Sequence, residues 1–242
     1  SGAYKLLFVW KNDSSWGDQP PAAVDNISMQ VPVSYSISTV AQLAYLADKV
    51  NEGDREGFYW CNAAGESLET GEKIPAGASE TIFKLQNDLT IAGENGEAIT
   101  WEPIGNVDFA NNVVSSFSGY FNGNGHVITM NIEATDAAFV GLFGAVEGGT
   151  VTNLGVSGTM TAEVTSGEGC YVAPICAGAM EANISNCFSN VDVTLSVDEE
   201  LEGMYAVGGI CAINDESSIS NSFNSGNVSG IGNEGIMAGG IC

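Results

Sequence analysis

The sequence predicts an all-β protein built as a right-handed parallel β-helix, a solenoid with one N-terminal capping α-helix and one N-terminal β-hairpin. Two observations favour this fold. One pattern recurs through the second half of the chain, and its apolar runs are short, β-branched and separated by Gly, Asn and Ser. Recurrence of this kind indicates a solenoid. Short β-branched runs between turn residues are typical of strands, whereas helical repeats need longer amphipathic segments.

The repeats can be followed from about residue 127 to the end of the sequence. Val151, Ile184 and Ile219 open similar motifs and lie 33 and 35 residues apart. Because the coils of a parallel β-helix stack about 4.8 Å apart, such residues should form a row along the axis. Extended upstream, this row predicts five inward-facing residues: Ile82, Val127, Val151, Ile184 and Ile219. A second row, three residues on, holds Leu85, Met130, Leu154, Cys187 and Ser222.

Residues 38–52 are predicted to form an α-helix. Ser38 or Thr39 can cap its N-terminus, and Gly53 suits its exit. One face carries apolar residues at helical spacing, namely Val40, Leu43, Ala44, Ala47 and Val50. Because the open end of a solenoid exposes strand edges that promote aggregation, we interpret this helix as the N-terminal cap of a β-helix domain over residues 38–242.

Residues 1–37 stand apart from the repeats and are predicted to form a β-hairpin, with strands over 3–10 and 22–31. Two strands alone are marginally stable in water. The segment resembles the last two strands of the jelly-roll β-sandwiches found in bacterial surface and carbohydrate-associated proteins, which implies the tail of a truncated domain. The alternative is that the hairpin packs onto the solenoid.

The residues between helix and repeats are less regular. Residues 51–80 are rich in Gly and acids and read as an irregular excursion, with an aromatic stretch at Phe58–Cys61. Residues 81–91 are predicted to be the first coil strand, turning at Asn87 and Asp88.

The segment 208–230, GGICAINDESSISNSFNSGNVSG, resembles the GLUG repeat of bacterial secreted and cell-surface proteins. Upstream, Trp101–Gly105 and Phe117–Ile128 resemble the segment that commonly leads into such repeats. The resemblance covers roughly residues 38–242. It implies a secreted or cell-surface protein that acts as a structural stalk or adhesin-like binding module, with a host or bacterial surface glycan or protein as its partner.

The charge excludes several classes of function. The chain carries 30 acidic and 6 basic residues, a formal net charge of −24, and no Lys or Arg follows Lys84. Nucleic acids and anionic membrane surfaces need basic clusters, so we expect neither as a partner. No apolar run approaches the ~18 residues of a membrane span. No stretch reads as a signal peptide, so we expect any export leader to lie upstream or to have been removed.

An enzyme is the alternative, because parallel β-helices include polysaccharide lyases and glycoside hydrolases. A lyase would need a strong base, and the repeats contain no Lys or Arg. A hydrolase needs two convergent carboxylates, whereas most acids here fall in loops that are typically solvated. His126, the single His, belongs to a Gly-rich turn and reads as a turn hydrogen-bonder. We therefore predict a protein that is not an enzyme, with no catalytic and no cofactor-binding residues.

The sequence suggests two further kinds of binding, each supported by fewer observations. Asp192, Asp198–Glu202 and Asp215–Glu216 could supply oxygen ligands to Ca²⁺, but they lack the spacing of known calcium loops, so no metal residues are assigned. Four aromatic residues could stack on sugar rings if they were exposed, but we predict that they are buried: Trp10, Trp16, Tyr59 and Trp60.

The cysteines of the repeats are predicted to be reduced. Cys176, Cys211 and Cys242 occupy one column, which Phe143 fills in the first repeat, so they read as small core residues. Parallel neighbours ~4.8 Å apart match disulfide geometry poorly. Because Met237–Cys242 opens a further repeat, we also expect the sequence to be a fragment that continues at both ends.

Overall fold

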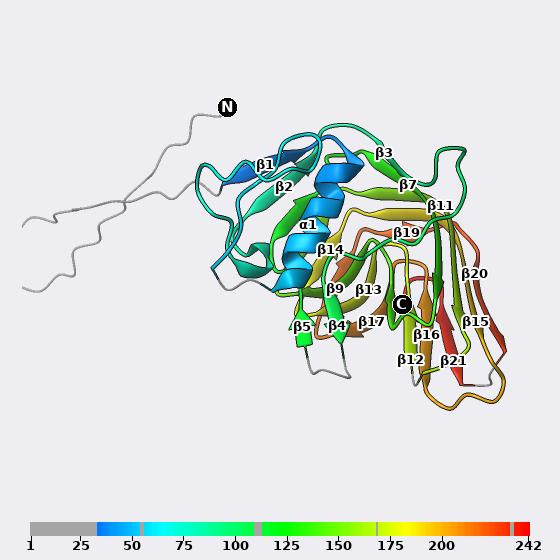
Figure 1. Ribbon diagram of the computed structural model, residues 1–242. Helices are drawn as coiled ribbons and strands as arrows, with labels where there is room; N and C mark the ends of the chain where they lie inside the picture. The colour runs from blue at the N-terminus through cyan, green and yellow to red at the C-terminus, as the bar shows by residue number, and fades with distance from the viewer. Residues whose placement is uncertain (1–32, 54–55, 109–112, 168, 233–234) are drawn as a thin grey trace, which may run out of the picture. The chain divides into compact units, whose positions relative to one another are not determined.

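The computed structural model (Figure 1) describes residues 33–53, 56–108, 113–167, 169–232 and 235–242. The chain divides into two compact units, Ser1–Val31 and Pro32–Cys242, and every described residue belongs to the second. Within these residues the fold is mostly β, with one α-helix, α1 (Val40–Glu52), and one short 3-10 helix (Ala76–Ala78). The predicted hairpin strands, with Trp10 and Trp16, lie outside the described residues.

Most strands belong to four parallel sheets. The first sheet contains, in spatial order, β1 (Ser34–Ile37), β2 (Ile82–Leu85), β6 (Tyr120–Asn122), β10 (Thr150–Thr152), β14 (Asn183–Ser185) and β18 (Ser218–Ser220). The second contains β3 (Leu89–Ile91), β7 (Val127–Thr135), β11 (Gly155–Val164) and β15 (Phe188–Val197), with β19 (Phe223–Asn224) and β20 (Val228–Gly232) both paired to β15.

The remaining strands follow the same pattern. The third sheet contains β8 (Phe139–Val140), β12 (Gly169–Val172), β16 (Met204–Gly208) and β21 (Ile236–Gly239). The fourth contains β9 (Phe143–Glu147), β13 (Cys176–Met180) and β17 (Cys211–Asp215). A separate antiparallel pair is formed by β4 (Asn106–Asp108) and β5 (Val113–Ser115).

From β6 onward the chain visits the four sheets in a fixed rotation and then begins again. Each strand pairs in parallel with the strand one rotation earlier and the strand one rotation later, as β11 does with β7 and β15. Every ladder between described strands after residue 127 is parallel, which confirms the predicted parallel pairing.

The predicted apolar row is correct downstream and wrong upstream. Val151, Ile184 and Ile219 lie opposite one another, the first two fully buried and Ile219 half-buried. Upstream, however, the row continues through Phe121 and Phe83, and not through Val127 and Ile82. Val127 lies past the corner, opposite Gly155 in the second sheet, and Ile82 pairs with Tyr120, one place from the row, so its side chain faces the other side of the sheet. The corner after β6 has four residues, 123–126, and the equivalent corner after β10 has two, 153–154, so spacing in the sequence does not preserve register.

The second predicted row is likewise interrupted. Leu154 and Cys187 are buried at equivalent places, since the N–H groups of Phe188 and Phe223 bond to their respective carbonyls at 3.0 and 3.2 Å. Met130 instead lies opposite Ile91 and Gly158, inside the second sheet.

Asparagine recurs at the corner after the first sheet for a backbone reason. Asn153, Asn186 and Asn221 have φ angles of 53°, 53° and 49°, in the left-handed region. Asn tolerates this conformation better than most residues with a side chain. The repeated Asn of the sequence motif therefore marks a repeated turn.

The helix forms as predicted, with one difference on its buried face. Thr39 caps its N-terminus, accepting a bond from the Gln42 N–H at 3.2 Å, and Gly53 ends it in the left-handed conformation. The buried residues of the helix are Gln42 and four apolar residues, Leu43, Leu46, Ala47 and Val50. Ala44, predicted to face the core, is exposed, because Leu46 takes part of that face.

Helix α1 packs against β1 and β3, the first strands of two sheets, and its apolar face joins the main core. Strand β1 was not expected: residues 34–37, assigned from sequence to the N-terminal segment, pair with β2 instead. No helix among the described residues has the length and apolar character needed to cross a membrane.

The aromatic stretch after α1 is a packed cluster. Phe58 and Trp60 are buried, and antiparallel bridges join Phe58 to Ile74 and Cys61 to Ser67. The Trp60 ring lies 5.2 Å from that of Phe83. Burial of Trp60 confirms the favoured reading for that residue, while Tyr59 is half-exposed.

Candidate functional site

Successive rotations of the chain through the sheets stack on one another. The rotation that contains Ile99 and Ile104 is shortened between these two residues, and we call this shortening the step. Ile99 lies opposite Ile132 of the second sheet, and Ile104 lies opposite Phe143 of the fourth. Only four residues, 100–103, connect these places, and they form no strand. One rotation later the connection from Ile132 to Phe143 takes ten residues, 133–142, and includes β8.

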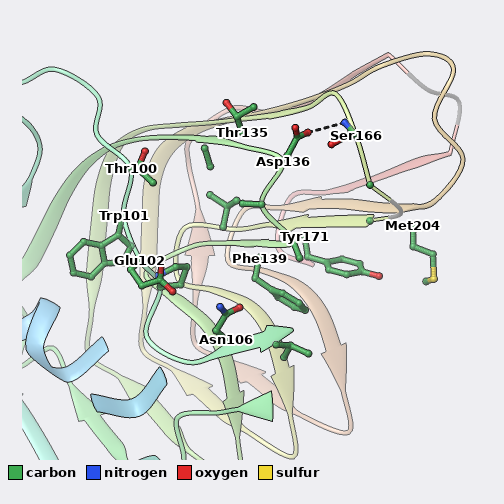
Figure 2. Close-up of a pocket in the computed structure, with 18 residues that line it drawn as sticks. Thr100, Trp101, Glu102, Asn106, Thr135, Asp136, Phe139, Ser166, Tyr171 and Met204 are labelled. Carbon is green, nitrogen blue, oxygen red and sulfur yellow. Dashed lines mark hydrogen bonds between the residues drawn. The ribbon is translucent and has the colours of Figure 1, made fainter. Parts of the chain in front are cut away.

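The connection lengthens again in the next rotation. The partners of Ile132 and Phe143 are Met160 and Cys176, which are joined by fifteen residues, 161–175, that include β12. The third sheet therefore begins at β8, because the shorter connection 100–103 contains no strand that could pair with β8. A cavity of about 790 Å³ lies at this step, and we call it the step groove. Its lining residues, drawn in Figure 2, are 100–103, 106–107, 134–140, 166–167, 169, 171 and 204.

The inner surface of the step groove is aromatic. Phe139 of β8 and Tyr171 of β12 are each 7% exposed, and their ring centroids lie 5.2 Å apart with planes tilted by 40°. Trp101 is half-buried in the short connection, where its indole Nε1–H donates to the Leu142 carbonyl at 3.4 Å. This bond to the next coil holds the indole in one orientation.

The Tyr171 ring is almost wholly buried, and its hydroxyl forms no hydrogen bond with the described residues. The hydroxyl is not one of their buried, unpartnered side-chain atoms, which are Asn51 Oδ1 and Ser116 Oγ, so it opens to the groove. Figure 2 shows the ring extending toward Met204, with the hydroxyl at its outer end. Burial raises the pKa of this phenol above its ordinary value, and the nearby Cys170 adds to the shift. Tyr171 therefore offers a neutral hydroxyl that can both donate and accept a hydrogen bond.

Asp136 lies on the rim and holds the neighbouring turn. Its Oδ1 accepts from the backbone N–H groups of Thr165 at 2.7 Å and Ser166 at 2.9 Å, and its Oδ2 accepts from the Thr165 hydroxyl at 3.0 Å. These bonds lower the pKa of the carboxyl, the one from Thr165 N–H most strongly. Figure 2 shows the carboxylate turned toward Ser166.

Glu102 is the second carboxylate of the rim. It is exposed, and its Oε1 accepts from the Asn51 side-chain amide at 3.2 Å. The same amide donates to the Pro103 carbonyl at 2.9 Å, so the C-terminal turn of α1 supports the short connection. None of the described residues that line the step groove is Lys, Arg or His.

The structure does not gather the calcium candidates into one site. Asp192 of β15 accepts from both the backbone N–H and the side-chain amide of Asn227 at 2.9 Å. Asp198 accepts from the Glu200 N–H at 3.1 Å within its own turn, and Asp215 and Glu216 lie at the end of β17. Among the described residues no three His, Cys, Asp or Glu side chains are grouped as a metal site.

His126 lies where its predicted role requires. Its Nδ1 is 3.0 Å from the Asp88 carboxylate, which also accepts from the Val127 N–H at 3.0 Å. These contacts tie the turn before β7 to the turn before β3, one coil below. His126 is thus a turn residue, remote in function from the step groove.

The step groove was not predicted from the sequence. Its residues come from several separate segments, and the signal that could have indicated it is the shortness of the connection around Trp101–Pro103. That shortness is visible only once Ile99 and Ile104 have been assigned partners in the next coil. In comparisons with protein-family models, curated proteins and solved structures, none matches the chain.

Proposed function

We propose that the chain is a secreted or cell-surface repeat protein of a bacterium, of the GLUG type, that serves as an adhesin-like binding module. The observation that carries the proposal is the step groove. It is an aromatic cavity with a polar rim at a place where one rotation of the described chain lacks a strand of the third sheet. Concave sites with apolar walls and a few polar groups are the usual form of ligand sites.

We propose further that the four sheets are the faces of a right-handed parallel β-helix. The fixed rotation of the chain through the sheets supports this arrangement, as does the in-register pairing of each coil with the next. Right-handed connection is the general rule for parallel strands. The repeated left-handed corners at Asn153, Asn186 and Asn221 fit successive coils of one design.

The strong negative charge is compatible with the proposed binding module. A net charge of −24 favours solubility and discourages association between copies of the chain. The partner is a glycan or a protein of a host or bacterial surface. A stalk role is compatible with the same architecture, because the stacked ladders join each coil to its neighbours along the axis.

A carbohydrate-active enzyme is the second candidate, and one observation favours it: both Glu102 and Asp136 line the step groove. Glycoside hydrolysis needs one carboxyl that stays protonated near neutral pH and a second aimed at the same bond. Asp136 is held ionised and faces Ser166. This orientation supports binding over catalysis.

The test uses the purified chain on immobilised glycans and extracellular-matrix proteins, with two variants. Trp101→Ala removes an aromatic wall of the step groove, and Tyr120→Ala removes an aromatic that is 39% exposed on the first sheet. We expect Trp101→Ala to weaken binding at least tenfold and Tyr120→Ala to leave it unchanged. Equal effects of the two variants would contradict the proposal, and release of reducing sugars that Glu102→Gln abolishes would support the enzyme.

A further inference from the structure

We propose that the step groove binds a neutral oligosaccharide, with a sugar ring against Trp101 and a sugar hydroxyl on the Tyr171 hydroxyl. The inference rests on the proposed binding function and names the ligand class of that site. It depends on three features of the groove: an accessible hydroxyl at the end of a buried ring, a mixed aromatic and polar lining, and the sign of its charges.

The first feature is the Tyr171 hydroxyl. The ring is buried in the wall of the groove, and the hydroxyl lies at its outer, open end (Figure 2). Tyr171 is 7% exposed, and its hydroxyl has no partner among the described residues. A ligand that brings its own hydroxyl satisfies the group in either direction, because both partners donate and accept.

The second feature is the arrangement of apolar and polar surface. Sugar rings have an apolar C–H face and a periphery of hydroxyls. The step groove offers the same division, with Trp101, Phe139 and Tyr171 inside and carboxylate and hydroxyl groups at the rim, among them Asp136 and Ser166. Since Trp101 is held by its bond to Leu142, its ring is in place before a ligand arrives. This preorganisation lowers the entropic cost of binding.

The third feature is charge. The titratable groups on the rim are carboxylates, and the described lining holds no cationic residue. A uronic acid or a phosphate would meet like charge there, which disfavours binding. A Lys-rich peptide would meet favourable charge, but Glu102 is exposed and screened by solvent. The Asp136 carboxylate already accepts three bonds. The polar group available to a ligand at the end of the Tyr171 ring is a neutral phenol, which favours a neutral ligand.

The experiment measures binding of the full chain to three sets of probes by calorimetry. The sets are neutral oligosaccharides in gluco, manno and galacto configuration, oligosaccharides that contain uronic acids, and Lys-rich peptides. We expect binding of at least one neutral oligosaccharide that is insensitive to salt, and no binding of uronates.

Two variants place the ligand. Tyr171→Phe removes the hydroxyl alone. It is expected to weaken the binding of the neutral sugar roughly three- to tenfold, as the loss of one hydrogen bond does. The matched control, Tyr120→Phe, removes an exposed hydroxyl on the first sheet and should change nothing. Should Tyr171→Phe lower the melting temperature, Met204→Ala at the exposed rim provides a second probe, expected to weaken binding without affecting the core.

The outcomes separate this inference from the proposed function. Binding of Lys-rich peptides or uronates alone, still lost in Trp101→Ala, overturns the sugar and leaves a binding module with another ligand. An affinity for neutral sugars that is unchanged in both Tyr171→Phe and Met204→Ala also overturns the inference. Binding that is indifferent to Trp101→Ala overturns the proposed function itself.

Discussion

Cys176 and Cys211 lie opposite each other in the parallel ladder between β13 and β17, and both thiols are free. The Cys176 thiol donates to the Gly178 carbonyl at 3.0 Å and the Cys211 thiol to the Ile213 carbonyl at 2.8 Å. Each thiol thus has an acceptor in its own strand, and the Cys211 thiol also interacts with the thiols of Cys176 and Cys242. The other four cysteines are also free, and Cys242 alone among the six is exposed.

We therefore predict that the denatured protein titrates six thiols, and that the native protein reacts with at most one on the time scale of minutes. Cys242 should react slowly even though it is exposed, because its hydrogen bond with the Cys211 thiol raises its pKa. Ellman titration with and without denaturant measures both numbers. Fewer than six thiols in denaturant would contradict the prediction that all are reduced.

Stability should fall as pH rises above about 9. Burial raises the pKa of Cys170 to about 12, against a usual thiol value of 9.0. Between these pH values the unfolded chain loses a proton that the folded chain keeps, so the free energy of unfolding decreases with pH. Chemical denaturation at pH 8 and at pH 10.5 should show a smaller loss for Cys170→Ala than for wild type. An equal loss in both proteins would assign the alkaline sensitivity to other groups.

The corner residues Glu181 and Glu216 are predicted sites of stabilisation. Both have φ of 48°, in the left-handed region, and their counterpart in the first repeat is Gly148, with φ of 65°. Left-handed backbone costs a residue with a side chain about 1–2 kcal/mol, part of which Gly loses again through its flexibility when unfolded. We expect Glu181→Gly to raise the free energy of unfolding by about 0.5–1 kcal/mol.

The matched change in the opposite direction is Gly148→Ala, which meets no atom within 4 Å and so isolates the backbone effect. It should destabilise by a similar amount. Urea denaturation of the three proteins compares them directly. A loss of stability in Glu181→Gly would show that the Glu side chain contributes more than its backbone costs.

The row of core residues can be tested by truncation. Ile184 is fully buried between Val151 and Ile219, so Ile184→Ala is expected to cost about 2–5 kcal/mol. Val127, at the start of β7, is only half-buried, and Val127→Ala should cost distinctly less. Similar losses in thermal or urea unfolding would mean that both residues belong to the same buried row.

The Asp136 carboxylate is expected to connect the turn at 165–166 to ligand binding. Asp136→Ala removes three accepted bonds and should weaken any step-groove ligand while leaving the core, and hence the melting temperature, nearly unchanged. Because the pKa of Asp136 is lowered in the folded protein, its contribution is present at neutral pH and is lost as the carboxyl protonates in acid. Binding measured from pH 7 down to pH 3 should therefore decline in wild type and be flat in Asp136→Ala.

Local chemistry in the sequence was enough to predict several elements. The helix at 40–52 follows from a capping Thr39, an apolar face and the exit at Gly53, all of which act within a few residues. The turn between β2 and β3 falls at residues 86–88, around the predicted Asn87 and Asp88. The parallel ladders after residue 127 follow from repeat spacing, because equal coils place like residues opposite one another.

Only the tertiary structure decided the features that depend on the number of residues in each rotation of the chain through the sheets. Phe83 and Phe121 continue the buried row. Val127 lies beyond the corner, opposite Gly155 in the second sheet, and Ile82 precedes Phe83 and so faces the other side of the strand. Likewise, the step groove exists because residues 100–103 cross in four residues a distance that the next coil crosses in ten. Such differences have no local signature, since strand pairing between distant segments defines them. For the same reason the burial of the Tyr171 ring, with its hydroxyl at the groove, follows from the pairing of distant strands and not from the residues around Tyr171 in sequence.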